Sequence, residues 1–249
     1  MILNVIKLSK YFPIEQGLFR AETGLIRALD EVSFSVDEFS TLGIVGESGS
    51  GKTTLAKIIL NLIPPTTGEF FFNEDFIGNF RKDVQIIFQN PYNSLNPKMR
   101  IFDIIAEPMI IHRIAAKKHL KAEVPELLET VGLDGDVLKR YPHEFSGGQR
   151  QRICIARALA SKPKFIVLDE PISSLDLTIQ AKLLDLFIEL KQKFNLTYIF
   201  ISHNLAVIKY ISDTVIVMQN GRIVERGKVY DIFNRPSEQY TKKLLESAM

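Results

Sequence analysis

The chain has 249 residues, of which 46% are hydrophobic, so it is long and apolar enough to bury a substantial core. Its 31 basic and 29 acidic residues leave a formal charge of +2, which provides no broad electrostatic footprint for nucleic acid as a partner. A single cysteine, Cys154, excludes an internal disulfide and a cysteine-rich metal site, and it fits a reducing compartment.

The first residues raise the question of a signal peptide. Met1–Lys10 is apolar, but it lacks a basic leader and a small-residue cleavage site, so we expect it to form a first strand. The apolar runs of the chain are strand-sized and fall short of the roughly 18 to 20 residues that span a bilayer. We therefore expect that the chain does not cross a membrane by itself.

Short β-rich runs dominate the first 90 residues. The polar stretch Pro13–Arg27, which contains two glycines, is expected to form an inserted loop or a hairpin. A helix is expected to begin at the glycine-rich turn near residue 50 and to run to about Ile63, because Pro64 and Pro65 cannot supply a helical N–H. The strands expected in this part are Leu3–Leu8, Ala28–Val36, Thr41–Val45, Gly68–Phe72 and Val84–Phe88.

The rest of the chain is expected to form a helical lobe, followed by helices and strands that alternate. Ile101 to Leu138 carries apolar residues at helical spacing and predicts a helical lobe, and short helices are expected from Val229 onward. From Ser146, helix and strand alternate, which implies a mostly parallel sheet with helices on both faces. The alternating elements are Gly147–Leu159, Phe165–Leu168, Leu177–Phe194, Thr197–Ile201, Val215–Met218 and Arg222–Glu225.

A phosphate-binding motif follows the third expected strand. Gly46–Thr53 matches G-x-x-x-x-G-K-[ST] and lies between the apolar run Leu42–Val45 and the helical run Leu55–Ile63. Glycines let backbone N–H groups wrap phosphate oxygens, Lys52 reaches the β- and γ-phosphates, and Thr53 can ligate Mg²⁺. A glycine-rich turn without function is the alternative, and the flanking strand and helix disfavour it. The residues predicted to bind ATP here are Gly46, Glu47, Ser48, Gly49, Ser50, Gly51, Lys52, Thr53 and Thr54.

Two adjacent carboxylates end an apolar strand at Phe165–Pro171. Asp169 is expected to serve Mg²⁺, directly or through water. Because adjacent strand residues face opposite ways, Glu170 can point elsewhere and polarise the water that attacks the γ-phosphate. Taken alone, such a pair more often belongs to a solvated turn than to a catalytic site. Together with the phosphate-binding motif, a catalytic role is favoured. A kinase, a GTPase and a motor are not distinguished by these two motifs.

The segment Phe145–Arg152, which reads FSGGQRQR, resembles the signature sequence of the ABC transporter ATPases. Physically, Ser146 can cap a helix whose N-terminal N–H groups face a phosphate, and a simple N-cap is the alternative. The resemblance implies an α/β fold with a P-loop NTPase (RecA-like) core, an antiparallel β subdomain and an inserted α-helical signature subdomain. It also implies one ATPase domain over residues 1–249, with the helical lobe at about 90–160 and a short tail at 229–249.

The resemblance also assigns roles to single residues. It implies head-to-tail dimers in which the signature of one subunit closes on the γ-phosphate held by Lys52 of the other. Gln89 resembles the Q-loop glutamine, Asp176 belongs to a D-loop, and His203 resembles the switch histidine. The catalytic residues implied are Glu170, His203, Gln89 and Lys52, the Mg²⁺ ligands are Thr53, Gln89 and Asp169, and the further ATP-binding residues are Ser146, Gly147, Gly148, Gln149 and Asp176.

An aromatic residue near the first strand usually stacks on adenine in this family, and Tyr11 and Phe12 are the two candidates. Phe12 is the better match by its spacing from Lys10. A core aromatic is the alternative. Stacking suits any flat ring and gives weak base selectivity, so hydrolysis of other nucleoside triphosphates is compatible with this assignment.

Three segments resemble ATPase subunits of oligopeptide, dipeptide and nickel importers: the loop after Phe12, the run Gln89–Pro97, and the tail with Arg235–Pro236, Tyr240–Thr241 and Leu244–Leu245. This resemblance implies ATP-driven uptake of oligopeptides or dipeptides through two transmembrane permease subunits. It also implies a second ATPase subunit, an extracytoplasmic solute-binding protein that acts indirectly, and a peripheral position on the cytoplasmic face of the cell membrane. A heterodimer is preferred, and a homodimer stays open. Many such subunits carry a cysteine-bearing extension that is not seen here, so no iron–sulfur site is expected.

Other classes fit less well. A nickel or metal-chelate importer is the first alternative, followed by an exporter or lipoprotein-release motor. A soluble ABC protein of DNA repair or translation usually has long coiled-coil insertions or two cassettes, and a nucleotide kinase would not need the signature. In the importer reading, a permease is expected to dock in a groove near Tyr92, Leu95 and Met99, and no residue is expected to contact the transported solute.

Overall fold

The computed structural model describes residues 1–16 and 21–247 of the chain, and these residues form two units. Unit 1 consists of Met1–Ile77 and Thr197–Met249, and unit 2 consists of Gly78–Leu196. Unit 1 therefore joins segments from both ends of the chain, whereas unit 2 is one continuous segment. The organisation into one domain with a helical lobe at about 90–160 and a tail at 229–249 stays a prediction.

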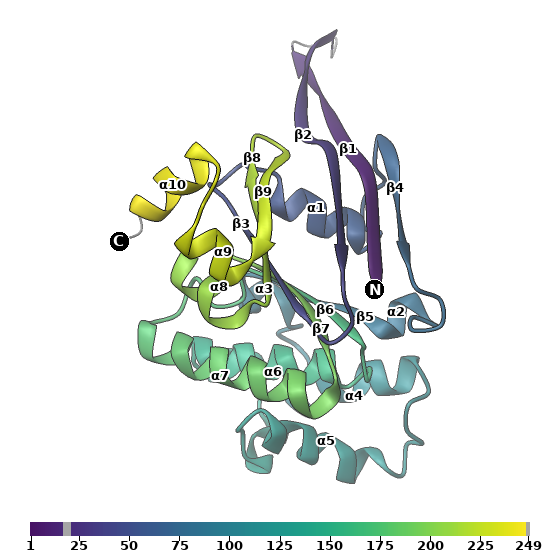
Figure 1. Ribbon diagram of the computed structural model, residues 1–249. Helices are drawn as coiled ribbons and strands as arrows, with labels where there is room; N and C mark the ends of the chain where they lie inside the picture. Colours follow the sequence, from purple (N-terminus) through teal and green to yellow (C-terminus); the bar gives the residue numbers. More distant parts are fainter. Residues whose placement is uncertain (17–20, 248–249) are drawn as a thin grey trace. The chain divides into compact units, whose positions relative to one another are not determined.

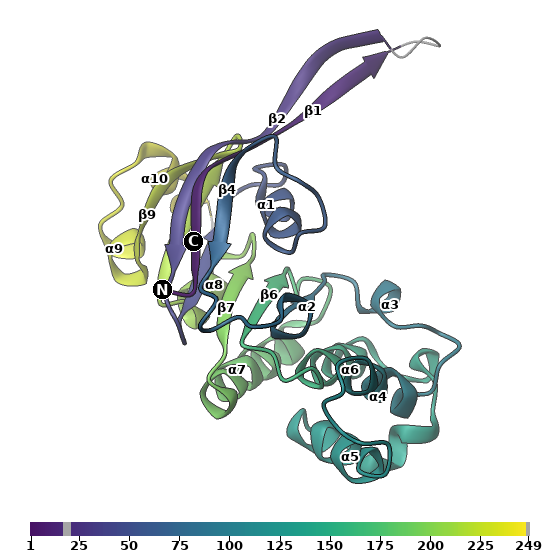
Figure 2. The same cartoon turned by 90° about the vertical axis from the view of Figure 1, so that its right-hand side faces the viewer.

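The first sheet of unit 1 is antiparallel and has the strand order β2-β1-β4. β1 and β2 form a hairpin that continues beyond the end of β4 (Figure 2). The first strand was expected to end at Leu8 and the second to begin at Ala28, so both strands are longer than expected. Backbone pairing in an antiparallel ladder needs no apolar pattern, so the sequence pattern did not show this extension. Of the two alternatives for Pro13–Arg27, the hairpin is confirmed for the residues that the structure describes. The strands are β1 (Leu3–Gln16), β2 (Ala21–Val36) and β4 (Thr67–Phe72).

Four further strands of unit 1 lie side by side in the order β7-β3-β8-β9. β7, β3 and β8 are parallel, and β9 runs antiparallel to β8. All five residues of β3 are buried, as expected for a strand with parallel neighbours on both sides. These strands are β3 (Thr41–Val45), β7 (Thr197–Ile201), β8 (Thr214–Gln219) and β9 (Arg222–Lys228).

The helix after the glycine-rich turn, α1 (Lys52–Ile59), ends before the expected Ile63. Asn61 adopts a left-handed conformation with φ +54°, and its N–H donates to the carbonyl of Ile58 at 2.8 Å. The N–H of Leu62 donates to the carbonyl of Lys57 at 2.9 Å. This pair of bonds is a Schellman motif, so an asparagine ends the helix before the prolines are reached.

Three helices near the C-terminus complete unit 1. They are α8 (Leu205–Ile211), α9 (Val229–Asn234) and α10 (Gln239–Glu246). In Figure 1, α9 and α10 are the yellow helices beside β8 and β9. The short helices expected after Val229 are therefore confirmed over the described residues.

Unit 2 combines two parallel strands with most of the helices. β5 (Val84–Ile87) pairs with β6 (Phe165–Asp169), and every residue of β6 is buried. The expected helices at Gly147–Leu159 and Leu177–Phe194 are confirmed with the same limits as α6 and α7. The remaining elements are α2 (Phe80–Asp83), α3 (Pro91–Ser94), α4 (Ile101–Ile111), α5 (Leu120–Thr130), η1 (Gly135–Lys139) and η2 (Pro142–Glu144).

The single cysteine lies inside unit 2. Cys154, on α6, is 4% exposed and forms no disulfide. Burial raises the pKa of its thiol to about 11, because the thiolate would lose its hydration. Across residues 1–16 and 21–247, no helix has both the length and the apolar character that crossing a membrane requires.

Candidate functional site

The phosphate-binding motif forms the loop between β3 and α1 in unit 1, and Lys52 is its central side chain. The Lys52 ammonium donates to the carbonyls of Gly46 at 2.7 Å and Glu47 at 2.8 Å, and to the Ser50 hydroxyl at 3.3 Å. Lys52 is only 5% exposed, whereas the side chain of Thr53 beside it is exposed. The loop therefore wraps around a positive charge at the start of a helix, which suits an anion.

Two glycines of this loop are required because the backbone of a neighbouring strand approaches each of them closely. A Cβ on Gly51 would lie 2.4 Å from the Ala28 carbonyl of β2, and Gly51 has φ +105°, which L side chains rarely adopt. A Cβ on Gly46 would lie 2.2 Å from the Met218 carbonyl of β8. The motif therefore needs glycine at both positions for packing as well as for phosphate.

The turn between β8 and β9 supports the end of the loop. Its Gly221 N–H donates to the carbonyl of Ser50 at 3.1 Å, and Asp30 N–H donates to the carbonyl of Gly221 at 2.9 Å. The Asp30 carboxylate accepts from Arg222 at 2.6 Å, and this bond lowers the pKa of Asp30. β2, the turn and the phosphate loop are thus connected by hydrogen bonds within unit 1.

The two candidate aromatic residues differ in their surroundings. The Tyr11 hydroxyl donates to Asp30 at 3.2 Å, so Tyr11 takes part in the contacts that support the loop. Phe12 is 38% exposed and pairs across the hairpin with Ile26, two residues from the Ala28 that meets Gly51. Phe12 thus presents a partly exposed ring on the same hairpin that contacts the phosphate loop, and the Lys10 ammonium lies 5.2 Å from the centre of this ring.

His203 lies at the same edge of the sheet as the phosphate loop. β3 and β7 are parallel with Ile44 opposite Ile201, and Ser202 N–H donates to the carbonyl of Ile44 at 3.2 Å. The carboxyl ends of both strands therefore meet at one edge. His203 is exposed there and precedes Asn204, which caps α8.

In unit 2, the two carboxylates and Gln89 also share one strand edge. β5 and β6 are parallel with Ile87 opposite Leu168, so exposed Gln89 and the pair at Asp169 and Glu170 follow neighbouring strand ends. Asp169 is 7% exposed, and Glu170 is partly exposed.

The expectation that strand alternation orients Glu170 is wrong. β6 ends at Asp169, before Glu170, so alternation along a strand does not orient Glu170. Glu170 has the left-handed value φ +49°, and its carbonyl accepts from the N–H of Ser173 at 3.3 Å and from the Ser173 hydroxyl at 3.2 Å. Glu170 therefore lies in a turn with an uncommon backbone conformation and not in the strand.

The signature segment forms the N-terminus of α6 with a capping box. Ser146 Oγ accepts from the N–H of Gln149 at 3.4 Å, and the Gln149 side chain accepts from the N–H of Ser146 at 3.1 Å. The Gln149 side chain is therefore engaged in its own helix start. The two glycines between them, Gly147 and Gly148, belong to the first turn of α6, where backbone N–H groups lack intrahelical acceptors.

The D-loop residue and the signature share one neighbour. Asp176 caps α7 by accepting from the N–H of Ile179 at 3.0 Å. A Cβ on Gly148 would lie 2.7 Å from Cγ2 of the same Ile179. Gly148 is therefore required by the packing of α6 against the start of α7.

Replacing Gly148 with valine is expected to lower the free energy of unfolding by about 1 to 3 kcal/mol, because the added atoms overpack against Ile179. Chemical denaturation measures this change. Adding Ile179→Ala should restore part of the loss, since it removes the obstructing methyl. Gly78→Val is the control, because no atom lies within 4 Å of a Cβ at Gly78. Equal effects at Gly148 and Gly78 would contradict the packing explanation.

The run after Gln89 packs on α6. The guanidinium of Arg150 lies 3.8 Å from the centre of the Tyr92 ring, and Arg157 donates to the carbonyl of Ser94. Tyr92 is 62% exposed and Leu95 is 3% exposed, so of these two residues only Tyr92 offers its side chain at the surface, and the docking groove expected near them stays a prediction. Leu95 belongs to the core of unit 2.

Sequence reasoning also missed two supports of the phosphate loop. One is the β8–β9 turn at Gly221, and the other is Tyr240, whose hydroxyl accepts from the N–H of Glu47 at 3.3 Å. Both contacts join residues more than 150 positions apart, and no local pattern in the sequence signals them.

A G-x-x-x-x-G-K-T loop between a buried parallel strand and a helix defines a P-loop nucleoside triphosphatase. A family model described as ABC transporter matches residues 29–173. The chain belongs to the ABC transporter family, whose ATP-binding members bind ATP and hydrolyse it to power transport.

Several relatives align with nearly the whole chain. The oligopeptide transport ATP-binding protein AppF of Bacillus subtilis is 46% identical over 255 residues, covering 99% of this chain and 78% of that protein. The dipeptide transport ATP-binding protein DppF of Haemophilus influenzae is 44% identical over 254 residues, covering 99% of this chain and 77% of that protein. The ABC importer reading of the sequence is therefore confirmed.

The fold prediction is confirmed by solved structures. The dimeric post-hydrolysis state of the ATP-binding cassette MJ0796, bound to ADP and Pi, aligns with a TM-score of 0.77 and 26% identity. The alignment covers 92% of this chain and 99% of that cassette. The fold is α/β with a P-loop NTPase core and a separate antiparallel sheet. Importer cassettes of this family act with transmembrane permeases and dimerise.

Proposed function

We propose that this chain is the ATP-hydrolysing subunit of an importer for oligopeptides or dipeptides. The observation that carries the proposal is the 46% identity to an oligopeptide transport ATP-binding protein over 99% of the chain. The transported solute would contact the permease and the solute-binding protein, so the specificity for peptides lies outside this chain.

In this proposal, the phosphate loop from Gly46 to Thr54 holds the triphosphate and Phe12 stacks on the base. Mg²⁺ would be held by the Thr53 hydroxyl, the Asp169 carboxylate and the Gln89 amide oxygen. All three groups are oxygen donors, which Mg²⁺ prefers, so the residues fit the ion. Bound Mg²⁺ would neutralise charge on the β- and γ-phosphates.

For hydrolysis, we assign Glu170 as the general base. It accepts a proton from water as the water oxygen bonds to the γ-phosphorus and the bond to the β-phosphate oxygen breaks, which releases ADP and phosphate. His203 would hold the γ-phosphate, and Lys52 would stabilise the charge that develops on its oxygens. The uncommon backbone conformation of Glu170 supports this role, since such conformations concentrate at active sites.

The signature would act on the nucleotide of a partner ATPase subunit. Ser146, Gly147 and Gly148 present the N-terminus of a 13-residue helix, whose dipole favours a γ-phosphate. Asp176 would contribute from the start of α7. Gln149 is better described as the capping partner of Ser146, and its contribution to ATP would be indirect.

The assembly we propose contains two permease subunits and a second ABC ATPase, preferably a different chain, on the cytoplasmic face of the membrane. The experiment that tests it is co-purification from the native membrane, followed by ATPase assays of the reconstituted complex. Recovery with a permease pair and stimulation by a peptide-loaded binding protein would support peptide import. Stimulation by nickel or a metal chelate would move the assignment to metal import, and recovery with ribosomes or DNA would overturn the transport role.

Tyr92→Ala is expected to keep the basal ATPase rate and to weaken permease binding about 10- to 30-fold, as for an exposed aromatic at the centre of an interface. The affinity for the reconstituted permease and the stimulated ATPase rate measure this. Tyr210→Ala is the control, because Tyr210 is similarly exposed at 58% and lies on α8. Unchanged stimulation in the Tyr92 variant would remove the run after Gln89 from the docking surface.

A further inference from the structure

The C-terminal helix α10 is fastened to β9 by one carboxylate. Glu225 accepts from the N–H of Ser237 at 2.7 Å, from the Ser237 hydroxyl at 2.7 Å and from the N–H of Glu238 at 3.3 Å. Burial alone raises the pKa of Glu225, but the neighbouring Thr241 hydroxyl and these hydrogen bonds outweigh burial and hold the pKa below its usual value. Thr241, in the first turn of α10, is only 1% exposed. The start of this helix is therefore fixed in place.

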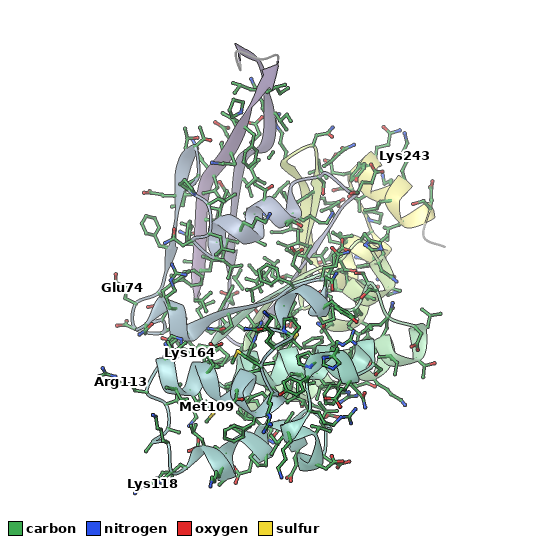
Figure 3. The ribbon with its side chains drawn as sticks, turned by 180° about the vertical axis from the view of Figure 1, so that it is seen from behind. Glu74, Met109, Arg113, Lys118, Lys164 and Lys243 are labelled. Carbon is green, nitrogen blue, oxygen red and sulfur yellow. The ribbon has the colours of Figure 1, made fainter. Side chains whose placement is uncertain are left out.

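Fixing the start of α10 sets the position of Tyr240 at the phosphate loop. The Tyr240 hydroxyl oxygen accepts from the backbone N–H of Glu47 at 3.3 Å, across 193 positions of sequence. The rigid ring carries the hydroxyl to the loop, and the hydroxyl is the group that contacts it. By contrast, Lys243 on the same helix, which is labelled in Figure 3, is exposed.

Glu47 is fixed at both of its backbone groups. Its N–H is bonded to Tyr240, and its carbonyl accepts from the Lys52 ammonium at 2.8 Å. The following residues, Ser48 and Gly49, are exposed, and Gly49 has a φ of +83°. A Cβ at Gly49 would meet no atom within 4 Å, so packing does not fix this stretch. The hydrogen bond from Glu47 to Tyr240 thus lies directly before an exposed stretch of the loop.

We propose that Tyr240 is a positioning residue for ATP binding: its hydroxyl holds the Glu47 peptide so that the phosphate loop is ordered before the nucleotide arrives. This inference rests on the assignment of the loop to ATP and is independent of the transported solute. Ordering the loop in advance removes part of the entropy cost of binding. Tyr240 acts on the loop backbone and takes no part in the reaction itself.

The test is Tyr240→Phe, which removes one oxygen and keeps the ring. A neutral hydrogen bond of this kind predicts that the dissociation constant for MgADP and the KM for ATP rise roughly 2- to 10-fold, with kcat unchanged. Amide hydrogen exchange in residues 46–50 should accelerate, while exchange in β9 stays as it was. Tyr230→Phe, the same chemical change at a 62% exposed residue of α9, should alter none of these quantities.

A second variant separates positioning from general stability. Glu225→Ala releases the start of α10, so it should weaken MgADP binding by the same route. In the double variant with Tyr240→Phe, the two effects should be less than additive, because both act through one contact. Thermal unfolding of each variant identifies any that fail to fold.

Three results would overturn the proposal. The first is unchanged affinity and unchanged exchange in Tyr240→Phe. The second is weaker binding without faster exchange at residues 46–50, which would place the hydroxyl on the nucleotide. The third is a lower kcat at unchanged KM. Failure of the wild-type chain to bind MgADP would instead contradict the ATP assignment, so the two failures are distinguishable.

Discussion

Replacing Glu170 with glutamine is expected to slow ATP hydrolysis by about 10²- to 10⁴-fold while ATP binding is retained. Glutamine has the same shape and can keep the bond from Ser173 to the carbonyl of residue 170, but its amide cannot accept the proton of the attacking water. The left-handed backbone conformation at residue 170 is equally unfavourable for glutamate and for glutamine. The change therefore isolates the proton transfer.

Single-turnover hydrolysis and equilibrium nucleotide binding together measure this outcome. Glu189→Gln is a matched control, since Glu189 is an exposed residue of α7 in the same unit. It should hydrolyse ATP at the wild-type rate. Full turnover in the Glu170 variant would require another residue as the base.

Lys52→Ala is expected to weaken ATP binding by about 10- to 100-fold. Hydrogen bonds from a charged group contribute about 1.5 to 3 kcal/mol each, and the ammonium is the buried positive charge inside the loop. Its removal has a second effect, because the carbonyls of Gly46 and Glu47 lose the donor that draws the loop together. Weaker charge attraction and a less ordered loop act in the same direction.

Titration with a fluorescent ADP derivative measures the change in affinity. Lys57→Ala on the same helix is the control, because Lys57 is exposed. It removes one positive charge from α1 without touching the loop. If both variants lost affinity equally, the effect would come from net charge, and Lys52 would have no specific role.

Elements governed by local chemistry could be predicted from the sequence. The limits of α6 follow from Ser146 as a cap and from the apolar spacing after it, and β6 follows from its continuous apolar run. The phosphate loop follows from spacing that its chemistry requires. The order of motifs then identified the family, which the relatives confirm.

Features set by contacts between distant residues could not be predicted in the same way. Leu95 lies in a polar run that looks like a surface loop, yet arginines of α6 hold its neighbours and Leu95 itself is buried. Asn61 ended α1 earlier than the prolines because a left-handed cap is a local alternative that competes with them. Glu170 lies in a turn after β6, which strand alternation does not describe.

Because the thiol of Cys154 is buried, spectroscopic probes can be attached to cysteines introduced into the native sequence. Only a thiolate reacts with maleimides, and with a pKa of about 11 roughly one thiol in ten thousand is ionised at neutral pH. A cysteine introduced at an exposed position, such as 92 or 243, would therefore carry a dye or a spin label without removal of the native residue. Distances between such labels would report how the cassette closes and opens during turnover.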